Sequence, residues 1–298
     1  MISPKTKREI PLYIMLLPGV ALVFVFNYLP MGGIIIAFQN YKPSLGFFNS
    51  AWVGLNHFRF MFMLPDTYLI IRNTLFIAGM KMIANFVFPI LLALLLNEVM
   101  SNKFKKRIQT IIYLPHFLSW IILGGMLRDM LSLGGIINQI IAFFGFTPLM
   151  FLGDKTVFPW VIIVTDVWKN LGFNTIVFLA ALTNINTELY ESAAIDGAGY
   201  LKRTRHVTLP GMSAIIILIG TLSLGSILNA GFEQIFALYS PIVYETGDII
   251  DTFVYRMGLV QSQYSLATAV GLLKSGVSFI LVSLSYFLAF KFGDYRIF

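Results

Sequence analysis

Polar and charged side chains inside long apolar segments are the residues of this chain best suited to chemistry. Ionisable groups are unfavourable within a membrane, so they usually have a function or a partner there. Hydrogen-bonding groups and aromatic faces together suit a solute with hydroxyl groups and apolar ring surfaces. We therefore expect a solute path here, although helix–helix hydrogen bonding or interfacial anchoring explains any single residue equally well. The candidates lie in or at the ends of such segments, and they are Asp166, Trp168, Lys169, Asn229, Phe232, Glu233, Gln234 and Lys274.

The charged candidates have simple alternative explanations. Asp166 and Lys169 are three positions apart in one segment, so they share a helix face and we expect them to pair. Lys81 and Lys274 lie within other apolar segments. Long basic side chains often extend to the membrane surface, which explains such positions without a bound solute.

No pattern in the sequence indicates catalysis or a metal site. The chain has no cysteine, and its three histidines, His57, His116 and His206, lie far apart. There is no G-x-x-x-x-G-K-[ST] stretch to hold the phosphates of ATP. We expect no catalytic residue, no metal site and no cofactor bound by this chain.

The elements that position these residues are predicted to be transmembrane helices. Of the 298 residues, 57% are hydrophobic and 12% are charged, whereas globular domains have about 25% charged residues. A spanning helix needs about 20 mainly apolar residues. Six segments qualify, and they predict an all-α polytopic membrane protein with a single domain over residues 1–298. The segments are Leu12–Phe38, Ile70–Met100, Thr110–Leu131, Val157–Leu182, Met212–Leu238 and Tyr264–Phe292.

Basic residues predict the orientation of these spans. Lysine and arginine are enriched in cytoplasmic loops. With six spans, four basic clusters fall on one side, which places both termini in the cytoplasm. The clusters are Lys5, Lys7 and Arg8; Lys103, Lys105, Lys106 and Arg107; Lys202, Arg203 and Arg205; and Lys291 and Arg296.

A polar insert at residues 187–211 separates the fourth and fifth predicted spans. Thr187 can cap a short helix that begins at Glu188, and Gly197 permits a sharp bend after it. A second short helix is expected from Tyr200 to about Val207, and Pro210 suits the first turn of the next span. The insert therefore predicts two short helices on the cytoplasmic side.

The insert resembles the EAA motif of binding-protein-dependent ABC importer permeases, which reads E-A-A, three residues, G, nine residues, I-x-L-P. Here Ser192 replaces the second-position alanine and Val207 replaces the isoleucine, while every spacing matches. The resemblance implies that this loop is a coupling helix that docks on a cytoplasmic ATPase. The residues implicated in coupling are Glu191, Ser192, Ala193, Asp196, Gly197, Leu209 and Pro210.

Most of the remaining chain is similar to the carbohydrate, maltose-type branch of that family, and to its complex-oligosaccharide subgroup in particular. The matching stretches include Trp52–Phe58, Tyr113–Pro115, Trp168–Phe173, Phe232–Phe236 and Tyr244–Thr252. This resemblance implies a non-catalytic permease subunit in a bacterial cell membrane. It implies as partners a second, homologous but different permease, an extracytoplasmic binding protein, and two ATPase subunits that carry ATP and Mg.

The resemblance implies an oligosaccharide as cargo. We expect a neutral sugar first, and an acidic one, such as a uronic-acid oligomer, is a narrower hypothesis. It is based on the intramembrane Lys81, Lys169 and Lys274 and on the outer-side Arg128 and Arg256, because a cation in a low-dielectric passage attracts an anion strongly.

Two other classes of protein remain as alternatives. A secondary transporter would work without an ATPase and often shows internal repeats. An intramembrane enzyme would need a convergent set of acids or metal ligands, whereas the acids here are scattered. Co-purification of an ATPase distinguishes the permease from both.

Overall fold

The computed structural model describes residues 4–99, 101–225 and 227–293, with side chains from residue 11 to residue 287. Both chain ends and Met100, the predicted end of the second span, lie outside the described residues. The chain divides into two compact units, Met1–Leu64 with Val254–Leu273, and Pro65–Phe253 with Lys274–Phe298. Each unit joins two separate stretches of the chain. The single domain over residues 1–298 that the sequence suggests stays a prediction.

The first unit contains the first predicted span and the loop that follows it. The span is one long helix whose side chains are mostly exposed on this chain, formed by α1 (Pro4–Val23), η1 (Phe24–Tyr28) and η2 (Leu29–Phe38). A hairpin of β1 (Gln39–Asn40) and β2 (Ala51–Trp52) encloses α2 (Gly46–Asn49), and α3 (Asn56–Met63) follows.

The α14–α15 turn completes this unit. The elements there are the last two residues of α14 (Ile250–Tyr255), η6 (Arg256–Val260) and the start of α15 (Tyr264–Gly293). The hydroxyl of Ser265 accepts a hydrogen bond from the backbone N–H of Tyr41 at 2.9 Å, which holds the start of α15 against the hairpin region.

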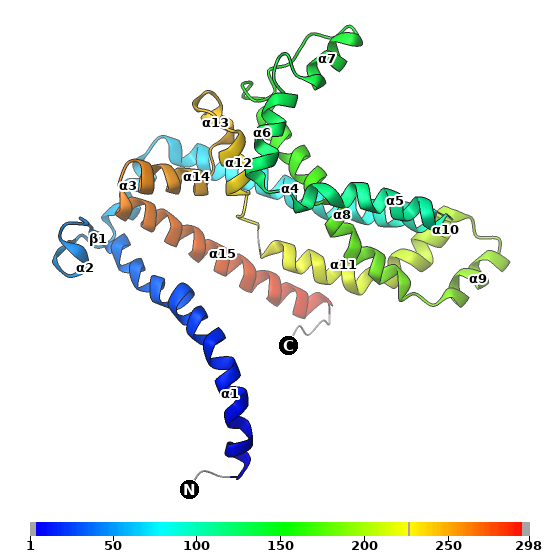
Figure 1. Cartoon of the computed structure of the whole chain (residues 1–298), viewed down its shortest axis with the longest axis horizontal. Coiled ribbons are helices and arrows are strands. Elements are labelled where there is room, and N and C mark those ends of the chain that lie inside the picture. The colour runs from blue at the N-terminus through cyan, green and yellow to red at the C-terminus, as the bar shows by residue number, and fades with distance from the viewer. Residues whose placement is uncertain (1–3, 100, 226, 294–298) are drawn as a thin grey trace. The chain divides into compact units, whose positions relative to one another are not determined.

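Two long helices form the centre of the second unit. They are α4 (Asp66–Asn97) and α8 (Phe158–Thr183), which pack side by side (Figure 1). One buried apolar cluster lies around Ile77, Phe158, Ile162 and Ile235, and another lies around Phe178 and Met212. These contacts fix the faces of α4 and α8 that carry the polar residues described below.

The third predicted span, Thr110–Leu131, is not one straight helix. The structure has α5 (Asn102–Tyr113), η3 (Leu114–Phe117) and α6 (Trp120–Met130), with a bend of 104° between the two halves. Pro115 lies at the start of η3, and Ser119 caps α6 by accepting from the N–H of Ile122 at 3.3 Å. Apolar residues continue through the bend, so the apolar pattern does not reveal it.

The fifth predicted span, Met212–Leu238, is also wrong as a continuous helix. Here α11 (Leu209–Leu224) ends, and the separate α12 (Phe232–Leu238) begins after Gly231. Gly231 has φ +88°, a conformation that glycine adopts at little cost. A Cβ there would lie 2.9 Å from Nζ of Lys81, so another residue would strain the backbone and push this ammonium group aside.

The end of the polar insert differs from the prediction as well. Residues from Tyr200 to Leu224 form one continuous helix through α10 (Tyr200–Arg203), η4 (Thr204–Thr208) and α11. Pro210 therefore does not separate a short helix from a span. Pro210 lies in the first turn of α11, directly after the π-helical turn of η4, and the helix continues through it.

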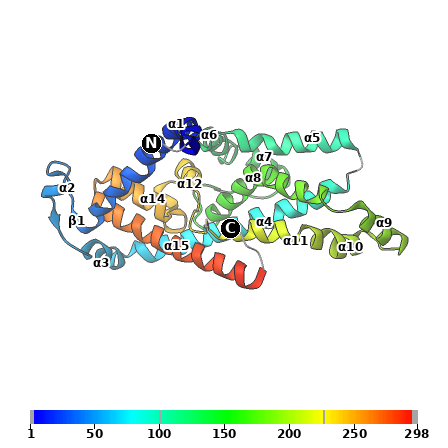
Figure 2. The ribbon, with the colours of Figure 1, turned by 90° about the horizontal axis from the view of Figure 1, so that it is seen from below.

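The described residues contain five helices long and apolar enough to cross a membrane, or six crossings if the bent α5–α6 pair counts as one. The remaining elements are α7 (Ile136–Phe143), α9 (Thr187–Ile195), η5 (Pro241–Val243) and α13 (Tyr244–Gly247). In both views α9 and α10 lie together at one end of the second unit (Figures 1 and 2).

Candidate functional site

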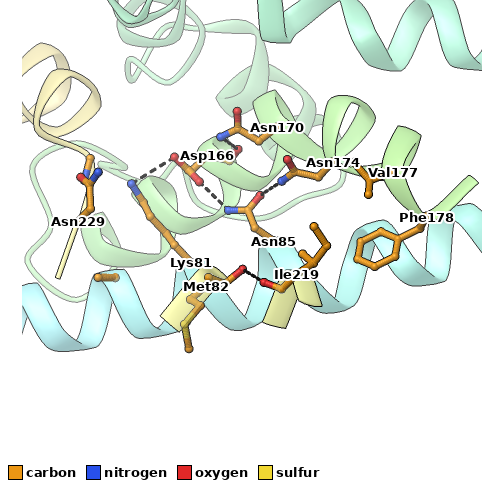
Figure 3. A pocket seen from close by; sticks show the side chains of 13 residues that line it. Lys81, Met82, Asn85, Asp166, Asn170, Asn174, Val177, Phe178, Ile219 and Asn229 are labelled. Carbon is orange, nitrogen blue, oxygen red and sulfur yellow. Dashed lines mark hydrogen bonds and ion pairs between the residues drawn. The ribbon is translucent and has the colours of Figure 1, made fainter. Parts of the chain in front are cut away.

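A cavity of about 400 Å³ lies between α4, α8, α11 and the segment that leads to α12. Figure 3 shows its polar side, where side chains from α4 and α8 point toward one another. Four asparagines line it together with one ion pair, so its surface offers both hydrogen-bond donors and acceptors. The polar lining residues are Lys81, Asn85, Asp166, Asn170, Asn174, Ser223 and Asn229.

Lys81 joins three elements at one end of this cavity. Its Nζ lies 3.4 Å from Oδ1 of Asp166 and donates to the carbonyl of Ala230 at 2.7 Å and to Oε1 of Gln234. Lys81 is buried, and these partners compensate for its desolvation. The predicted ion pair between Asp166 and Lys169 is therefore wrong, because α4 brings Lys81 to the Asp166 carboxylate.

A row of amides continues from this ion pair along α4 and α8. Asn85 donates to Oδ2 of Asp166 at 2.7 Å, and Asn174 donates to Oδ1 of Asn85 at 3.4 Å. Asn170 donates to the backbone carbonyl of Asp166 at 3.1 Å. Asp166, Asn170 and Asn174 are four positions apart, so the polar stripe was visible in the sequence, but only Asp166 was predicted.

Lys169 stabilises the bend of the third span instead of lining the cavity. Its Nζ donates to the carbonyls of His116 at 2.9 Å and Leu118 at 2.5 Å, and it lies 5.4 Å from the ring centroid of Trp120. Backbone carbonyls released by a break in a spanning helix need such partners, because lipid offers none. The substrate-path prediction for Lys169 has no support in this geometry.

A second cavity, of about 450 Å³, lies beside the first and contains Lys274. Nζ of Lys274 is 2.6 and 2.7 Å from the two carboxylate oxygens of Asp251. Asn229 lines both cavities, and the ring of Phe232 lines the second. The structure thus brings three predicted path residues, Asn229, Phe232 and Lys274, to one cavity, whereas Asp251 was not predicted.

The other predicted path residues lie elsewhere. Trp168 is 46% exposed on α8, and Glu233 is exposed at the start of α12; neither lines the two cavities. Gln234 is fully buried and donates to the carbonyl of Ile162 and the hydroxyl of Thr165, at 2.7 and 2.8 Å. Its amide holds α12 to α8, so it is not open to a solute.

The polar insert forms a capped helix and a tight turn. Asn186, and not Thr187 as predicted, caps α9, because its side-chain oxygen accepts from the N–H of Glu188 at 3.0 Å. At the other end the N–H groups of Gly197 and Ala198 donate to the carbonyls of residues 194 and 193, a Schellman turn that Gly197 permits with φ +72°.

Apolar side chains project from this turn. Ile195 is 87% exposed and Leu201 is 78% exposed. The predicted coupling residues Glu191, Ser192, Asp196, Gly197 and Pro210 are also exposed, while Ala193 and Leu209 are partly buried. The tip of the insert is therefore an accessible surface of mixed polarity.

An exposed ion pair joins two segments outside the candidate spans. Lys155 donates to Oε2 of Glu245 at 2.6 Å. This hydrogen bond and the positive charge of Lys155 hold the pKa of the Glu245 carboxyl below its ordinary value.

Comparison with known proteins identifies the family. Residues 85–294 match the family described as "Binding-protein-dependent transport system inner membrane component". The chain is 44% identical over 284 residues to the "Polygalacturonan/rhamnogalacturonan transport system permease protein YteP" of Bacillus subtilis (strain 168), covering 95% of this chain and 88% of that protein.

Two solved structures are similar over almost the whole chain. One is a bacterial ABC transporter involved in the import of the acidic polysaccharide alginate, with TM-score 0.89, 38% identity, and coverage of 97% of this chain and 98% of that chain. The other is a bacterial alginate ABC transporter in complex with an alginate pentasaccharide-bound periplasmic protein, with TM-score 0.88, 38% identity and 96% coverage of each chain.

These matches confirm the resemblance inferred from the insert and from the stretches similar to sugar permeases. Permeases of this kind generally work with a second permease, and the ATPase is a separate subunit. The chain therefore belongs to the binding-protein-dependent transport system inner membrane component family, as a non-catalytic membrane permease subunit of an oligosaccharide-importing ABC transporter.

Proposed function

We propose that this permease imports acidic oligosaccharides that contain uronic acids. The observation that carries the proposal is the similarity, over nearly the whole chain, to a polygalacturonan/rhamnogalacturonan permease and to an alginate importer. Both names refer to acidic polysaccharides. The proposal does not rest on the intramembrane lysines, whose ammonium groups are hydrogen-bonded or ion-paired within the chain.

The amide-lined cavity is the part of the path that receives sugar hydroxyls. Its volume of about 400 Å³ falls within the roughly 300–1,000 Å³ of small-molecule sites. Amides donate and accept at once, so Asn85, Asn174 and Asn229 suit hydroxyl groups. Lys81 and Asp166 compensate each other's charge, which leaves this cavity suited to the uncharged part of a sugar.

The insert at residues 187–211 docks on an ATPase subunit in this proposal. Exposed Ile195 and Leu201 at its tip suit an apolar groove on a partner, and the Schellman turn presents them rigidly. ATP and Mg bind to two such ATPase subunits and not to this chain. Motion at the insert can reach the cavities because residues 200–224 are one continuous helix.

The complete importer then contains a second, homologous but different permease and an extracytoplasmic binding protein. The chain is a multi-pass protein of a bacterial cell membrane, with the insert and both termini in the cytoplasm. The basic residues around the insert, Lys202, Arg203 and Arg205, support this orientation.

Competition uptake into proteoliposomes that contain the complete importer tests the cargo. We expect trigalacturonate to be imported and to compete with an acidic polysaccharide fragment, while a neutral trisaccharide does neither. If the neutral trisaccharide is imported at the same rate, the proposal of an acidic cargo is wrong. The chain then remains an oligosaccharide permease. Uptake that needs no ATPase subunit overturns the proposed importer as a whole.

A further inference from the structure

We propose that Lys274 anchors a carboxylate of the transported sugar, with Asp251 as the counter-ion that the sugar displaces. This inference rests on the proposed function, because it requires an acidic cargo. The site is the cavity of about 450 Å³ lined by Gly225, Leu228, Asn229, Phe232, Asp251, Lys274 and Ser278.

The position of Lys274 makes it available to a ligand. It is the one charged residue in the sequence from 264 to 287, a stretch apolar enough to span a membrane. Its side chain is 19% exposed and that of Asp251 is 27% exposed. Both groups line the cavity, so their ion pair faces open space and is not sealed between helices.

The contrast with Lys81 shows why this pair can exchange. Lys81 is held by a carboxylate, a backbone carbonyl and a buried amide on three elements. The hydrogen bonds of the Lys274 ammonium in the described residues run to the two oxygens of Asp251. A ligand carboxylate can replace that one carboxylate with the same charge and similar geometry, so the ammonium need not remain unpaired during exchange.

The remaining walls of the cavity fit a pyranose ring that bears a carboxylate. Ser278 is one helical turn from Lys274 and adds a hydroxyl on the same face of α15. Asn229 adds an amide, and its side-chain oxygen accepts from the N–H of Gly231 at 3.3 Å. Phe232, whose ring stacks on that of Phe236, adds an aromatic side chain to the lining. Charge, hydroxyl-binding groups and an aromatic surface therefore meet in one cavity.

The two cavities then divide the recognition of one oligosaccharide. Asn229 belongs to both linings, so a chain of sugar units can pass from one cavity to the other at this residue. The first cavity contacts hydroxyl groups, and the second selects for the carboxylate.

Equilibrium binding to the purified, complete importer in nanodiscs tests this inference. The ligands are trigalacturonate and its fully methyl-esterified form, which has the same length and no charge. For Lys274→Met we expect binding of trigalacturonate to weaken by about tenfold or more, because a charge-assisted hydrogen bond is lost, with little change for the ester. For Asp251→Asn we expect trigalacturonate to bind several-fold more tightly, because the competing carboxylate is gone.

Opposite effects of the two substitutions on the affinity for trigalacturonate are the decisive result. If the ion pair were purely structural, either substitution would break it, and both would lower the affinity. Lys155→Met is the matched control, since it removes a lysine from an exposed ion pair outside the cavity and should change neither affinity. Three results would overturn the carboxylate site. They are an equal loss of affinity for the acid and the ester in Lys274→Met, failure of both variants to assemble with their partners, and no binding of trigalacturonate to the unmodified importer. The proposed function is judged separately by uptake into proteoliposomes with the unmodified importer.

Discussion

The ammonium group of Lys81 lies 3.4 Å from the carboxylate of Asp166 and fastens α4 to α8 at the edge of the amide-lined cavity. The same ammonium group holds the carbonyl of Ala230, where the fifth span is interrupted. One side chain therefore links the central helix pair to the helix break, and its removal should affect both.

Lys81→Met is expected to destabilise the permease strongly. The substitution leaves the buried Asp166 carboxylate without its cation, a change that costs about 3–5 kcal/mol in other proteins. Thermal unfolding of the purified importer, followed by size-exclusion chromatography, measures the effect. The exposed pair offers Lys155→Met as a control with little expected change. An unaltered melting temperature for Lys81→Met contradicts a structural role for the pair.

Lys169→Met is expected to destabilise the bend between α5 and α6. It leaves two backbone carbonyls, of residues 116 and 118, without their donor, at about 1–3 kcal/mol for each unsatisfied buried group. Thermal unfolding again measures the loss. The neighbouring Trp168→Leu is the matched control, because Trp168 is exposed on the same helix. Equal melting temperatures for the two variants exclude the proposed role of Lys169.

Local sequence patterns predicted the parts of this protein that depend on short stretches of chain. Apolar length located most of the helices, and motif spacing located the polar insert between α8 and α11. The pairing of charges was not predicted correctly, because it depends on which helices are neighbours. Asp166 had a lysine three positions away on its own helix, yet the packing of α4 against α8 supplied Lys81 instead.

The helix breaks could not be seen in the apolar pattern for a related reason. Apolar residues stand directly before and after Gly231 and residues 118–119, so no polar stretch marks either break. What stabilises each break is a lysine distant in sequence that donates to the released carbonyls, Lys81 in one case and Lys169 in the other. Hydropathy measures how favourably a segment transfers into lipid. It carries no information about hydrogen-bond donors that lie far away in the sequence.

Gly231→Ala is expected to be tolerated poorly. The residue has φ +88°, and the added methyl group would lie 2.9 Å from Nζ of Lys81. We expect a loss of about 1 kcal/mol or more in unfolding free energy, because alanine is strained at positive φ. Gly79→Ala is the control, since Gly79 lies within α4 with open space around its Cα and should tolerate alanine. Equal stability of the two variants would contradict this account of the break.

Single cysteines test the proposed orientation of the chain. No native cysteine interferes, and Leu201 and Ile242 are 78% and 62% exposed. An impermeant thiol reagent added to intact cells should label Ile242→Cys and leave Leu201→Cys unlabelled until the cells are opened. Labelling of Leu201→Cys alone reverses the predicted topology.

Ile195→Glu tests the coupling role of the insert without disturbing its fold. Gly197→Arg is less suitable, because any side chain at φ +72° strains the Schellman turn and its effect would mix strain with docking. Ile195 is 87% exposed and lies two positions after Ala193, the last residue of the E-A-A match, so a charge there changes the surface and leaves the helix cap intact.

We expect the Ile195→Glu permease to reach the membrane with an unchanged melting temperature but to lose its ATPase subunits on purification and to lose uptake. A buried charge without a partner in an interface costs several kcal/mol, which is enough to separate the subunits. Phe48→Glu is the matched control, because Phe48 is fully exposed in the hairpin region of the other unit. It receives the same charge and should retain both the ATPase and uptake. Normal ATPase retention in the Ile195→Glu variant would place the docking surface away from the tip of the insert.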